Sequence, residues 1–250
     1  MGLRSRSRLT EDSMNAMGTD GLKRRAAEAA LAFLRPGMRV GLGTGSTAAH
    51  FVELAGAKAR GGLDLLCVPT SEATREQATR CGLKLTTLDD CSELDLTVDG
   101  ADEFDDRLRL VKGGGGALLR EKIVASGSRR MVVIADASKR VATLGAYALP
   151  VEIDPFGARS TLRRIEAVAQ EIGLVGRTTI RLTSQGAPFL TDGGNYIVDC
   201  AYGAIPDVEA LARGLDATVG VVEHGLFIGI ATSVLVASES GVETLGEPAP

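Results

Sequence analysis

The stretch that decides the fold is residues 94–122, LDLTVDGADEFDDRLRLVKGGGGALLREK. Two short apolar segments, residues 94–98 and 108–111, each lead into a polar turn. The turns carry three acids, a lysine and a run of glycines: Asp99, Asp102, Glu103, Lys112, Gly113, Gly114, Gly115 and Gly116. Turns of this kind bring carboxylates and a lysine close to bare backbone N–H groups. The stretch therefore predicts a site for a small anionic, oxygen-rich substrate.

The composition narrows the classes of protein to consider. The chain has 250 residues, of which 44% are hydrophobic and 24% charged, as is typical of a soluble globular protein. Its net charge of −4 argues against a nucleic-acid-binding protein that relies on phosphate contacts. No apolar run approaches the ~20 residues that a membrane helix needs. We therefore expect a small-molecule substrate as the partner, and neither nucleic acid nor membrane.

The cysteines and histidines do not have the spacing of a metal site. A CxxC pair is absent from the sequence, and the chain has only two histidines. The residues concerned are Cys67, Cys81, Cys91, Cys200, His50 and His224. We interpret the cysteines as reduced thiols of a cytoplasmic protein, and the spacing argues against a zinc cluster.

Residues 1–18 contain basic residues but no apolar core of a signal peptide. We interpret this segment as a disordered N-terminal extension. On that interpretation Met14 or Met17 could be the true start of the protein.

The next part of the chain alternates helical and apolar segments. Helices are predicted at residues 20–34 with Asp20 as the cap, at 48–60 and at 71–80, and strands at 39–43, 63–68, 83–87, 94–98 and 130–135. Continuous apolar strands that alternate with helices predict a Rossmann-like parallel sheet covered on both faces. Ligands bind beyond the carboxyl ends of such strands. Four motifs follow predicted strands: GTGST (43–47), DGADE (99–103), KGGGG (112–116) and DASK (136–139).

After Pro150 the order of elements changes to strand, helix, strand, strand, helix, strand. The predicted segments are residues 151–153, 158–172, 178–182, 195–198, 206–213 and 217–222. This order is typical of a ferredoxin-like arrangement. It predicts an α+β lid domain at 150–222, inserted into an α/β catalytic domain made of 19–149 and 223–250. Predicted strands at 226–230 and 233–237 return to that catalytic domain.

The GTGST turn resembles a phosphate site at the N-terminus of a helix. Backbone N–H groups and the hydroxyls of Thr44, Ser46 and Thr47 would face the anion there. The spacing does not meet GxGxxG, because Ala48 stands where a third glycine would fall, and no GK[ST] of a P-loop follows. A tight turn that merely caps the helix is an equally good interpretation of this segment alone.

The carboxylates and lysines have two interpretations. Asp99 and Asp102 could direct both side chains into one pocket, or belong to a solvated loop or a metal site, although Lys112 would compete with a metal. Glu121 could be a favourable acid near a helix N-terminus or a general base. As a base, with Lys112 and the glycine amides stabilising an oxyanion, it would suit enolisation beside a carbonyl. Lys139 could face solvent or contact a phosphate.

Five motifs in this order resemble ribose-5-phosphate isomerases of the A type. They are GTGST (43–47), DGAD (99–102), KGGG with REK (112–115 and 120–122), ADASK (135–139) and LPVE (149–152). The resemblance extends from about Asp20 to the C-terminus. It implies interconversion of D-ribose 5-phosphate and D-ribulose 5-phosphate through an enediol(ate), without a metal or cofactor, in the non-oxidative pentose phosphate pathway. It also implies a homodimer or homotetramer.

The resemblance also implies roles for single residues. Glu121 is the expected base, Lys112 is expected to stabilise the intermediate, and Asp99 is expected to assist ring opening and proton traffic beside Asp102. Lys23 in the first helix and Lys139 are expected at the phosphate. The substrate-binding residues implied are Lys23, Thr44, Gly45, Ser46, Thr47, Asp99, Gly100, Ala101, Asp102, Lys112, Gly113, Gly114, Gly115 and Lys139.

The chain departs from the family pattern at residues 215–227, LDATVGVVEHGLF, where Asp216 and Ala217 replace a common Pro-Gly pair. His224 stands where Asn is usual, and we interpret it as a surface residue of the hinge.

Two other classes of protein compete with this interpretation. A sugar-phosphate sensor would need a DNA-binding segment and would not need Glu121. A nucleotide-binding dehydrogenase would need the third glycine and an acid at the end of the next strand. Another sugar-phosphate isomerase or deaminase of similar fold is a further alternative.

Overall fold

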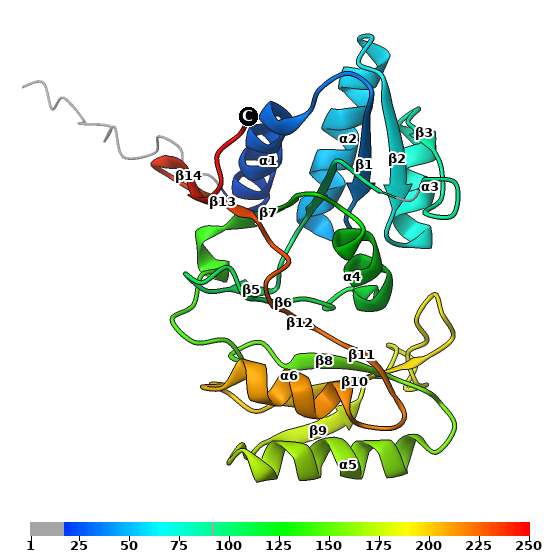
Figure 1. Cartoon of the computed structure of the whole chain (residues 1–250), viewed down its shortest axis with the longest axis vertical. Coiled ribbons are helices and arrows are strands. Elements are labelled where there is room, and N and C mark those ends of the chain that lie inside the picture. The colour runs from blue at the N-terminus through cyan, green and yellow to red at the C-terminus, as the bar shows by residue number, and fades with distance from the viewer. Residues whose placement is uncertain (1–17, 92) are drawn as a thin grey trace, which may run out of the picture.

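The computed structural model describes residues 18–91 and 93–250. The predicted N-terminal extension, apart from Gly18, lies outside these residues. Three sheets follow one another along the long axis of the molecule (Figure 1). A large sheet with its helices forms the upper part, a three-stranded sheet lies in the middle, and a four-stranded sheet with two helices forms the lower part. No helix within the described ranges is long and apolar enough to cross a membrane.

The large sheet has seven strands in the order β14-β13-β7-β4-β1-β2-β3. Six run parallel and β14 runs antiparallel to its neighbour β13. The strands are β1 (Met38–Leu42), β2 (Leu65–Pro69), β3 (Lys84–Leu85), β4 (Leu96–Asp99), β7 (Met131–Asp136), β13 (Ser233–Ser238) and β14 (Gly241–Gly246). The predicted α/β class with a mostly parallel sheet is confirmed. The half-exposed strand β14 was not predicted, since its segment is short of apolar residues.

Both faces of the large sheet are buried, and β7 (Met131–Asp136) shows why residues 131–135 are all apolar. Val132 and Ile134 pack in a core under α1 (Thr19–Ala30) and α2 (Ser46–Arg60). Met131 and Val133 pack on the opposite face, in a core that includes residues of the three-stranded sheet and of α4. Alternate side chains of a strand point to opposite faces, so a strand buried on both sides needs apolar residues at every position.

Some helices begin at a side-chain cap and others do not. Ser71 caps α3 (Glu72–Arg80), because its side-chain oxygen accepts a hydrogen bond from the Thr74 N–H. The cap of α1, however, is Gly18 and not the predicted Asp20, which lies in the first turn. An acid is favourable there as well, because the first turn carries the positive end of the helix dipole. The other helical elements are η2 (Leu31–Phe33), α4 (Leu118–Ser126) and η3 (Ala137–Lys139).

The middle sheet consists of β5 (Glu103–Phe104), β6 (Leu110–Val111) and β12 (Leu226–Phe227) in the order β12-β6-β5. Its strands are antiparallel. The KGGGG motif therefore follows a strand of this sheet and not, as predicted, a strand of the parallel sheet. The physical reason is the short connection after β4, since a parallel crossover needs a dozen or more residues. The motif still reaches the same edge, because only residues 100–102 separate the end of β4 from β5.

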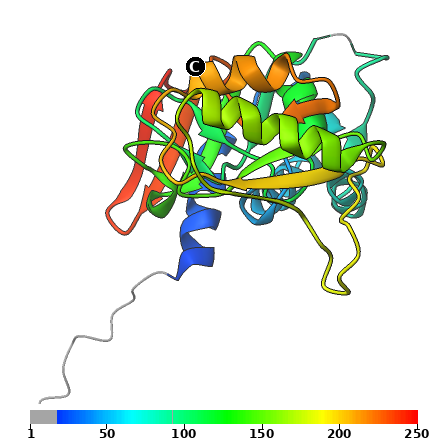
Figure 2. The same cartoon turned by 90° about the horizontal axis from the view of Figure 1, so that it is seen from below.

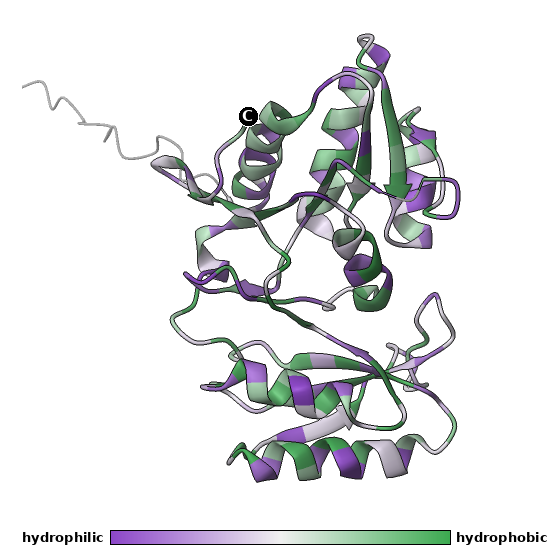
Figure 3. Cartoon of the chain, viewed as in Figure 1, coloured by the Kyte–Doolittle hydropathy of each residue, from purple (hydrophilic) through white to green (hydrophobic). Residues whose placement is uncertain are grey.

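The lower part, which we call the small unit, contains a four-stranded antiparallel sheet in the order β11-β8-β10-β9. Its elements are β8 (Leu149–Ile153), α5 (Ala158–Glu171), β9 (Arg177–Ile180), β10 (Tyr196–Ala201), α6 (Val208–Asp216) and β11 (Val221–His224). This is the predicted ferredoxin-like order. Figure 2 shows α5 and α6 side by side, and Figure 3 shows that each carries hydrophobic and hydrophilic residues, as expected for helices that bury one face.

The last strand of the small unit begins later than predicted. Residues 217–222 were expected as a strand, whereas α6 extends to Asp216 and β11 begins at Val221. The chain enters and leaves the small unit at one place, because Gly225 N–H donates to the Pro150 carbonyl at 2.8 Å and the Gly225 carbonyl accepts from Lys112 N–H at 2.8 Å. The division into 19–149 with 223–250 and 150–222 stays a prediction.

Candidate active site

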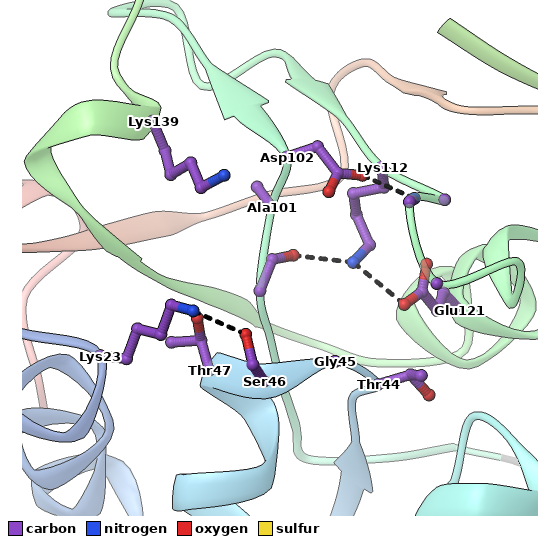
Figure 4. A pocket seen from close by; sticks show the side chains of 14 residues that line it. Lys23, Thr44, Gly45, Ser46, Thr47, Ala101, Asp102, Lys112, Glu121 and Lys139 are labelled. Atoms are coloured by element: carbon purple, nitrogen blue, oxygen red, sulfur yellow. Dashed lines mark hydrogen bonds and ion pairs between the residues drawn. The ribbon is translucent and has the colours of Figure 1, made fainter. Parts of the chain in front are cut away.

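A cavity of about 110 Å³ lies at the carboxyl ends of β1, β4 and β7, beside the turn that follows β6 (Figure 4). The 14 residues that line it were all singled out from the sequence. They are Lys23, Thr44, Gly45, Ser46, Thr47, Gly100, Ala101, Asp102, Lys112, Gly113, Gly114, Gly115, Glu121 and Lys139. Asp99, the remaining predicted residue, has no exposed surface and lies behind Lys112. The structure therefore brings the predicted residues together, with Asp99 beneath the wall of the cavity.

Lys112 is the centre of a buried charged cluster at one end of the cavity. Its Nζ lies 2.8 Å from Asp99 Oδ2 and 3.4 Å from Glu121 Oε1. It also donates a hydrogen bond to the Gly100 carbonyl at 2.7 Å (Figure 4). The ring of Phe227 lies 5.5 Å from the ammonium. Two carboxyl groups thus share one ammonium group in a place from which water is largely excluded.

Burial and mutual repulsion change the proton affinities in this cluster. Burial, and then the nearby Asp99, raise the pKa of Glu121 to about 8. Burial likewise raises the pKa of Asp99, against the attraction of Lys112. Burial alone would lower the pKa of Lys112, but Asp99 and Glu121 outweigh it and hold that pKa above its ordinary value. A carboxyl group whose pKa lies close to neutral pH can both take and return a proton, as a general base must.

Glu121 lies in the first turn of α4, directly after the glycine run. The side chain is buried, and its Oε2 atom finds no hydrogen-bond partner within residues 18–91 and 93–250. Buried carboxylate oxygens normally have such partners, so an unpartnered one on the wall of a cavity makes Glu121 a candidate functional group. The alternative interpretation of Glu121, as an ordinary helix-end acid, does not account for this burial.

The glycine run forms the wall opposite the parallel sheet. Gly114 N–H donates to Asp102 Oδ2 at 2.7 Å, which fixes the turn to the end of β4 (Figure 4). A Cβ atom at Gly114 would lie 2.5 Å from Asp102 Oδ1 and 2.6 Å from the Tyr147 hydroxyl, so a larger residue does not fit. Gly113 and Gly115 also line the cavity. Backbone N–H groups here can stabilise a developing negative charge.

The opposite end of the cavity suits a phosphate. Ser46 and Thr47 form the first turn of α2, where unpaired N–H groups and the helix dipole attract anions. Lys23 of α1 donates a hydrogen bond to Ser46 Oγ at 2.9 Å, and Lys139 of η3 points toward the same cavity (Figure 4). Two lysines and a helix N-terminus thus form a positively charged end of the cavity, whereas the other end holds both carboxylates and a lysine.

Thr44 lines the cavity, but its hydroxyl is directed away from it. Thr44 Oγ1 lies 2.8 Å from both Thr70 Oγ1 and Ser71 Oγ, and Thr44 N–H donates to Asp99 Oδ1 at 3.1 Å. Thr44 therefore joins the GTGST turn to the start of α3 and to Asp99. This arrangement differs from the predicted use of the Thr44 hydroxyl as a substrate contact.

Gly43 shows how closely the two turns approach. A Cβ atom at Gly43 would lie 2.1 Å from Asp99 Oδ1 and 2.6 Å from Asp99 Cα. Only glycine allows the backbone of the first turn to pass this close to the buried carboxylate. Gly100 also contacts that carboxylate, because its N–H donates to Asp99 Oδ1 at 2.7 Å.

Three residues near the glycine run were missed from the sequence: Tyr147, Arg181 and Phe189. The Arg181 side chain donates from Nη1 to the carbonyls of Gly113 and Gly114, at 3.0 and 3.1 Å. A Cβ atom at Gly116 would lie 2.4 Å from the Phe189 ring. The sequence signal for Arg181 was an arginine at the end of a half-buried strand. That signal does not indicate which carbonyl groups the side chain binds.

His224 is buried, with 4% of its surface exposed, so the prediction of a surface histidine is wrong. Its Nε2 lies 3.1 Å from Asp216 Oδ1, and burial lowers its pKa. Together with Glu223 these residues have the donor spacing of a metal site. Lys122 Nζ lies 2.6 Å from Glu223 and 3.4 Å from His224 Nδ1. An ammonium group in that position competes with a cation for the same donors.

The chain is similar to proteins of known name over most of its length. A family model described as ribose 5-phosphate isomerase A (phosphoriboisomerase A) matches residues 66–241. A protein of Rhodopseudomonas palustris (strain HaA2) named ribose-5-phosphate isomerase A is 58% identical over 229 residues, which are 92% of this chain and 99% of that protein. The protein of the same name from Parvibaculum lavamentivorans is 54% identical with the same coverage.

Solved structures agree with these relatives. The structure of ribose 5-phosphate isomerase A from Methanocaldococcus jannaschii matches with a TM-score of 0.85 and 36% identity, over 92% of this chain and 100% of that chain. A D-ribose-5-phosphate isomerase in complex with phospho-erythronic acid matches with a TM-score of 0.86 and 33% identity, over 92% and 100%. On these matches, the chain belongs to the ribose-5-phosphate isomerase A family.

Proposed function

We propose that this chain interconverts D-ribose 5-phosphate and D-ribulose 5-phosphate through an enediolate, with Glu121 as the base. The observation that carries the proposal is the unpartnered, buried Glu121 carboxylate oxygen beside Lys112. It lies at one end of a cavity whose other end suits a phosphate. The reaction belongs to the non-oxidative pentose phosphate pathway. The complex of a relative with phospho-erythronic acid, a phosphorylated four-carbon acid, supports a phosphorylated sugar as the substrate.

The phosphate would bind at the N-terminus of α2, between Lys23 and Lys139, with contacts from Ser46 and Thr47. This anchor directs the C1–C2 end of the open-chain sugar toward Lys112 and Glu121. Binding energy from the phosphate, which does not react, thus orients the reacting carbons.

Glu121 would remove the proton from C2 of the aldose. The C–H electron pair forms the C1–C2 double bond, and the carbonyl pair moves to O1, where Lys112 and the glycine amides stabilise the negative charge. A proton then passes from O2 to O1, and Glu121 returns its proton to C1, which leaves a carbonyl at C2. No atom is gained or lost, and no electron acceptor is needed.

Two carboxylates would have different tasks in these steps. Asp102 lines the cavity and is the better placed group for proton transfer between O1 and O2 and for ring opening. Asp99 has no exposed surface, so we assign it to holding Lys112 in place rather than to direct contact with the sugar. The proposed steps use protein side chains and amides alone, and therefore no metal or cofactor.

Three further properties belong to the proposal. Residues 150–222 would act as a lid domain on the catalytic domain formed by 19–149 and 223–250. The protein would be cytoplasmic and would form a homodimer or homotetramer, as the family resemblance implies.

The experiment is an isomerase assay in the presence of a chelator. The protein is incubated with ribose 5-phosphate and EDTA, and ketopentose is measured; we expect ribulose 5-phosphate to form at the same rate as without EDTA. In D2O, deuterium at the carbon that receives the proton would support an enediol route with solvent exchange. Ribose 5-phosphate that binds but yields no ketopentose, with or without divalent metals, would instead indicate a sensor and overturn the proposal.

A further inference from the structure

Arg181 connects the small unit to the glycine run of the cavity. It follows directly after β9, and its Nη1 atom donates to the Gly113 carbonyl at 3.0 Å and to the Gly114 carbonyl at 3.1 Å. It does not line the cavity itself. A single guanidinium nitrogen thus binds two consecutive carbonyls on the outer side of the loop whose inner side faces the substrate site.

The guanidinium group is itself held in one orientation. Asp199 on β10 accepts from Arg181 Nε at 2.9 Å and from Nη2 at 2.5 Å. The Phe189 ring lies 5.9 Å from the guanidinium carbon, and the Arg181 side chain is 16% exposed. A planar guanidinium bound to a carboxylate through two nitrogens has little freedom to rotate, so its third nitrogen is aimed at the loop.

These contacts fix two successive peptide groups. The Gly113–Gly114 peptide is held on both sides, because its carbonyl accepts from Arg181 and its N–H donates to Asp102. In a trans peptide the C=O and N–H groups point in opposite directions. Holding the Gly114 carbonyl at Arg181 therefore directs the Gly115 N–H away from Arg181. Gly115 lines the cavity, and its N–H has no hydrogen-bond acceptor in the described part of the chain.

We propose that Arg181 is a positioning residue, which holds the glycine run so that the Gly115 N–H is directed at the enediolate. This inference rests on the proposed function. Four consecutive glycines have more conformational freedom than any other four residues. The Gly116 N–H closes the run by donating to the Gly113 carbonyl at 2.9 Å, and an external constraint limits the freedom that remains to the amides. Arg181 supplies that constraint from the small unit. The small unit is thereby part of the catalytic apparatus although none of its residues lines the cavity.

The test compares Arg181→Met with a matched control, Arg109→Met. Arg109 also joins the main body to the small unit, through Asp105 and Glu209 on α6, and its side chain is 13% exposed. We expect Arg181→Met to lower kcat about 10- to 100-fold, since amides that are not preorganised stabilise the oxyanion poorly, and to leave KM within about threefold. Arg109→Met is expected to keep kcat within about twofold at a comparable change in melting temperature.

Two further measurements separate positioning from mere stability. Phospho-erythronic acid carries a carboxylate, whereas inorganic phosphate has no group to place near Gly115. Arg181→Met should weaken inhibition by phospho-erythronic acid about 10-fold and inhibition by inorganic phosphate by less than about twofold. Arg181→Lys, which restores one donor without the fork, should recover part of kcat.

The inference is overturned if Arg181→Met and Arg109→Met have the same kcat, or if the loss lies in KM alone. If Arg181→Met does not fold, Asp199→Asn replaces it. That variant keeps the arginine but weakens its clamp, and an unchanged kcat would equally overturn the inference. Failure of the proposed function would show differently, as a wild-type protein that forms no ketopentose at all.

Discussion

Lys112 Nζ lies 3.4 Å from Glu121 Oε1, and the two side chains are 2% and 5% exposed. The ammonium attracts the ionised carboxylate, whereas burial and Asp99 oppose its ionisation, and the balance places the pKa of Glu121 at about 8. A base with this pKa is mostly protonated at neutral pH. The distance between these two residues therefore has consequences for the rate and for the stability of the protein.

The rate should rise with pH. Because only ionised Glu121 can take the C2 proton, we expect kcat/KM to increase through a midpoint near pH 8, the pKa of about 8 raised by burial and by Asp99. The second ionisation of a sugar phosphate, at a pKa of about 6, lies lower and does not obscure the midpoint. Initial rates between about pH 7 and pH 9 measure it. A flat profile over this range would contradict the raised pKa.

Removal of the base should affect turnover and not binding. Glu121→Gln keeps the shape of the side chain and removes the proton acceptor, so we expect kcat to fall about 10²- to 10⁴-fold with KM nearly unchanged. Steady-state kinetics and calorimetric titration with ribose 5-phosphate measure the two effects. Glu209→Gln on α6 is the control, and it should retain full activity. A Glu121→Gln variant with near-normal turnover would show that another residue is the base.

The same substitution should change the pH dependence of stability. The pKa of Glu121 is raised in the folded protein from 4.5 to about 8, so its contribution to stability is complete below about pH 4.5 and is lost as pH rises through about 8. Glu121→Gln removes this loss. The free energy of unfolding of Glu121→Gln minus that of the wild type should therefore be larger at pH 9 than at pH 5, by on the order of a few kcal/mol. Urea unfolding at both pH values provides the comparison, and a difference that does not vary with pH would contradict it.

The two ends of the cavity should give different kinetic effects. Lys112→Met removes the cation beside the developing charge, so we expect kcat to fall about 100-fold or more. Lys139→Met removes a proposed phosphate contact, so KM should rise about 10-fold and inhibition by inorganic phosphate should weaken. A rise in KM alone for Lys112→Met would make Lys112 a binding residue. Melting temperatures serve as the check on folding for both variants.

Gly43→Ala tests the close approach of the first turn to Asp99. The added methyl group would lie 2.1 Å from Asp99 Oδ1, so the turn or the carboxylate must move. We expect the free energy of unfolding to fall by about 1–3 kcal/mol, and kcat to fall with it, because Asp99 holds Lys112. Gly127→Ala is the control, since a Cβ there meets its nearest atom at 3.5 Å and changes neither quantity appreciably. Equal effects of the two substitutions would contradict the role of Gly43.

Much of the fold and the cavity follows from local patterns in the sequence. Apolar runs such as residues 130–135 predict strands buried on both faces, and parallel strands place the turns that follow them at one edge. That is why Thr47, Asp102 and Lys139, which lie far apart in the chain, meet in one cavity. The glycine run lines the same cavity although β6 belongs to another sheet, because β5 and β6 form a short antiparallel hairpin at the same edge.

Contacts that depend on tertiary packing could not be predicted. The Thr44 hydroxyl is directed toward the start of α3 only because β1 and β2 are neighbours in the sheet. His224 is buried by its position between β8 and α4 rather than by its own sequence context. The target of Arg181 lies more than sixty residues away along the chain. Local periodicity carries no information about such pairs.

The pairing of β6 with β12 also has a consequence for folding during translation. Lys112 follows a strand whose partner, Leu226–Phe227, is translated only after the whole small unit, and Phe227 supplies the ring beside the lysine. A nascent chain that ends at residue 224 thus has an open strand edge and an incomplete lysine environment. Unpaired strand edges can pair with other chains, so we expect early termination to yield an aggregation-prone fragment rather than a weak enzyme.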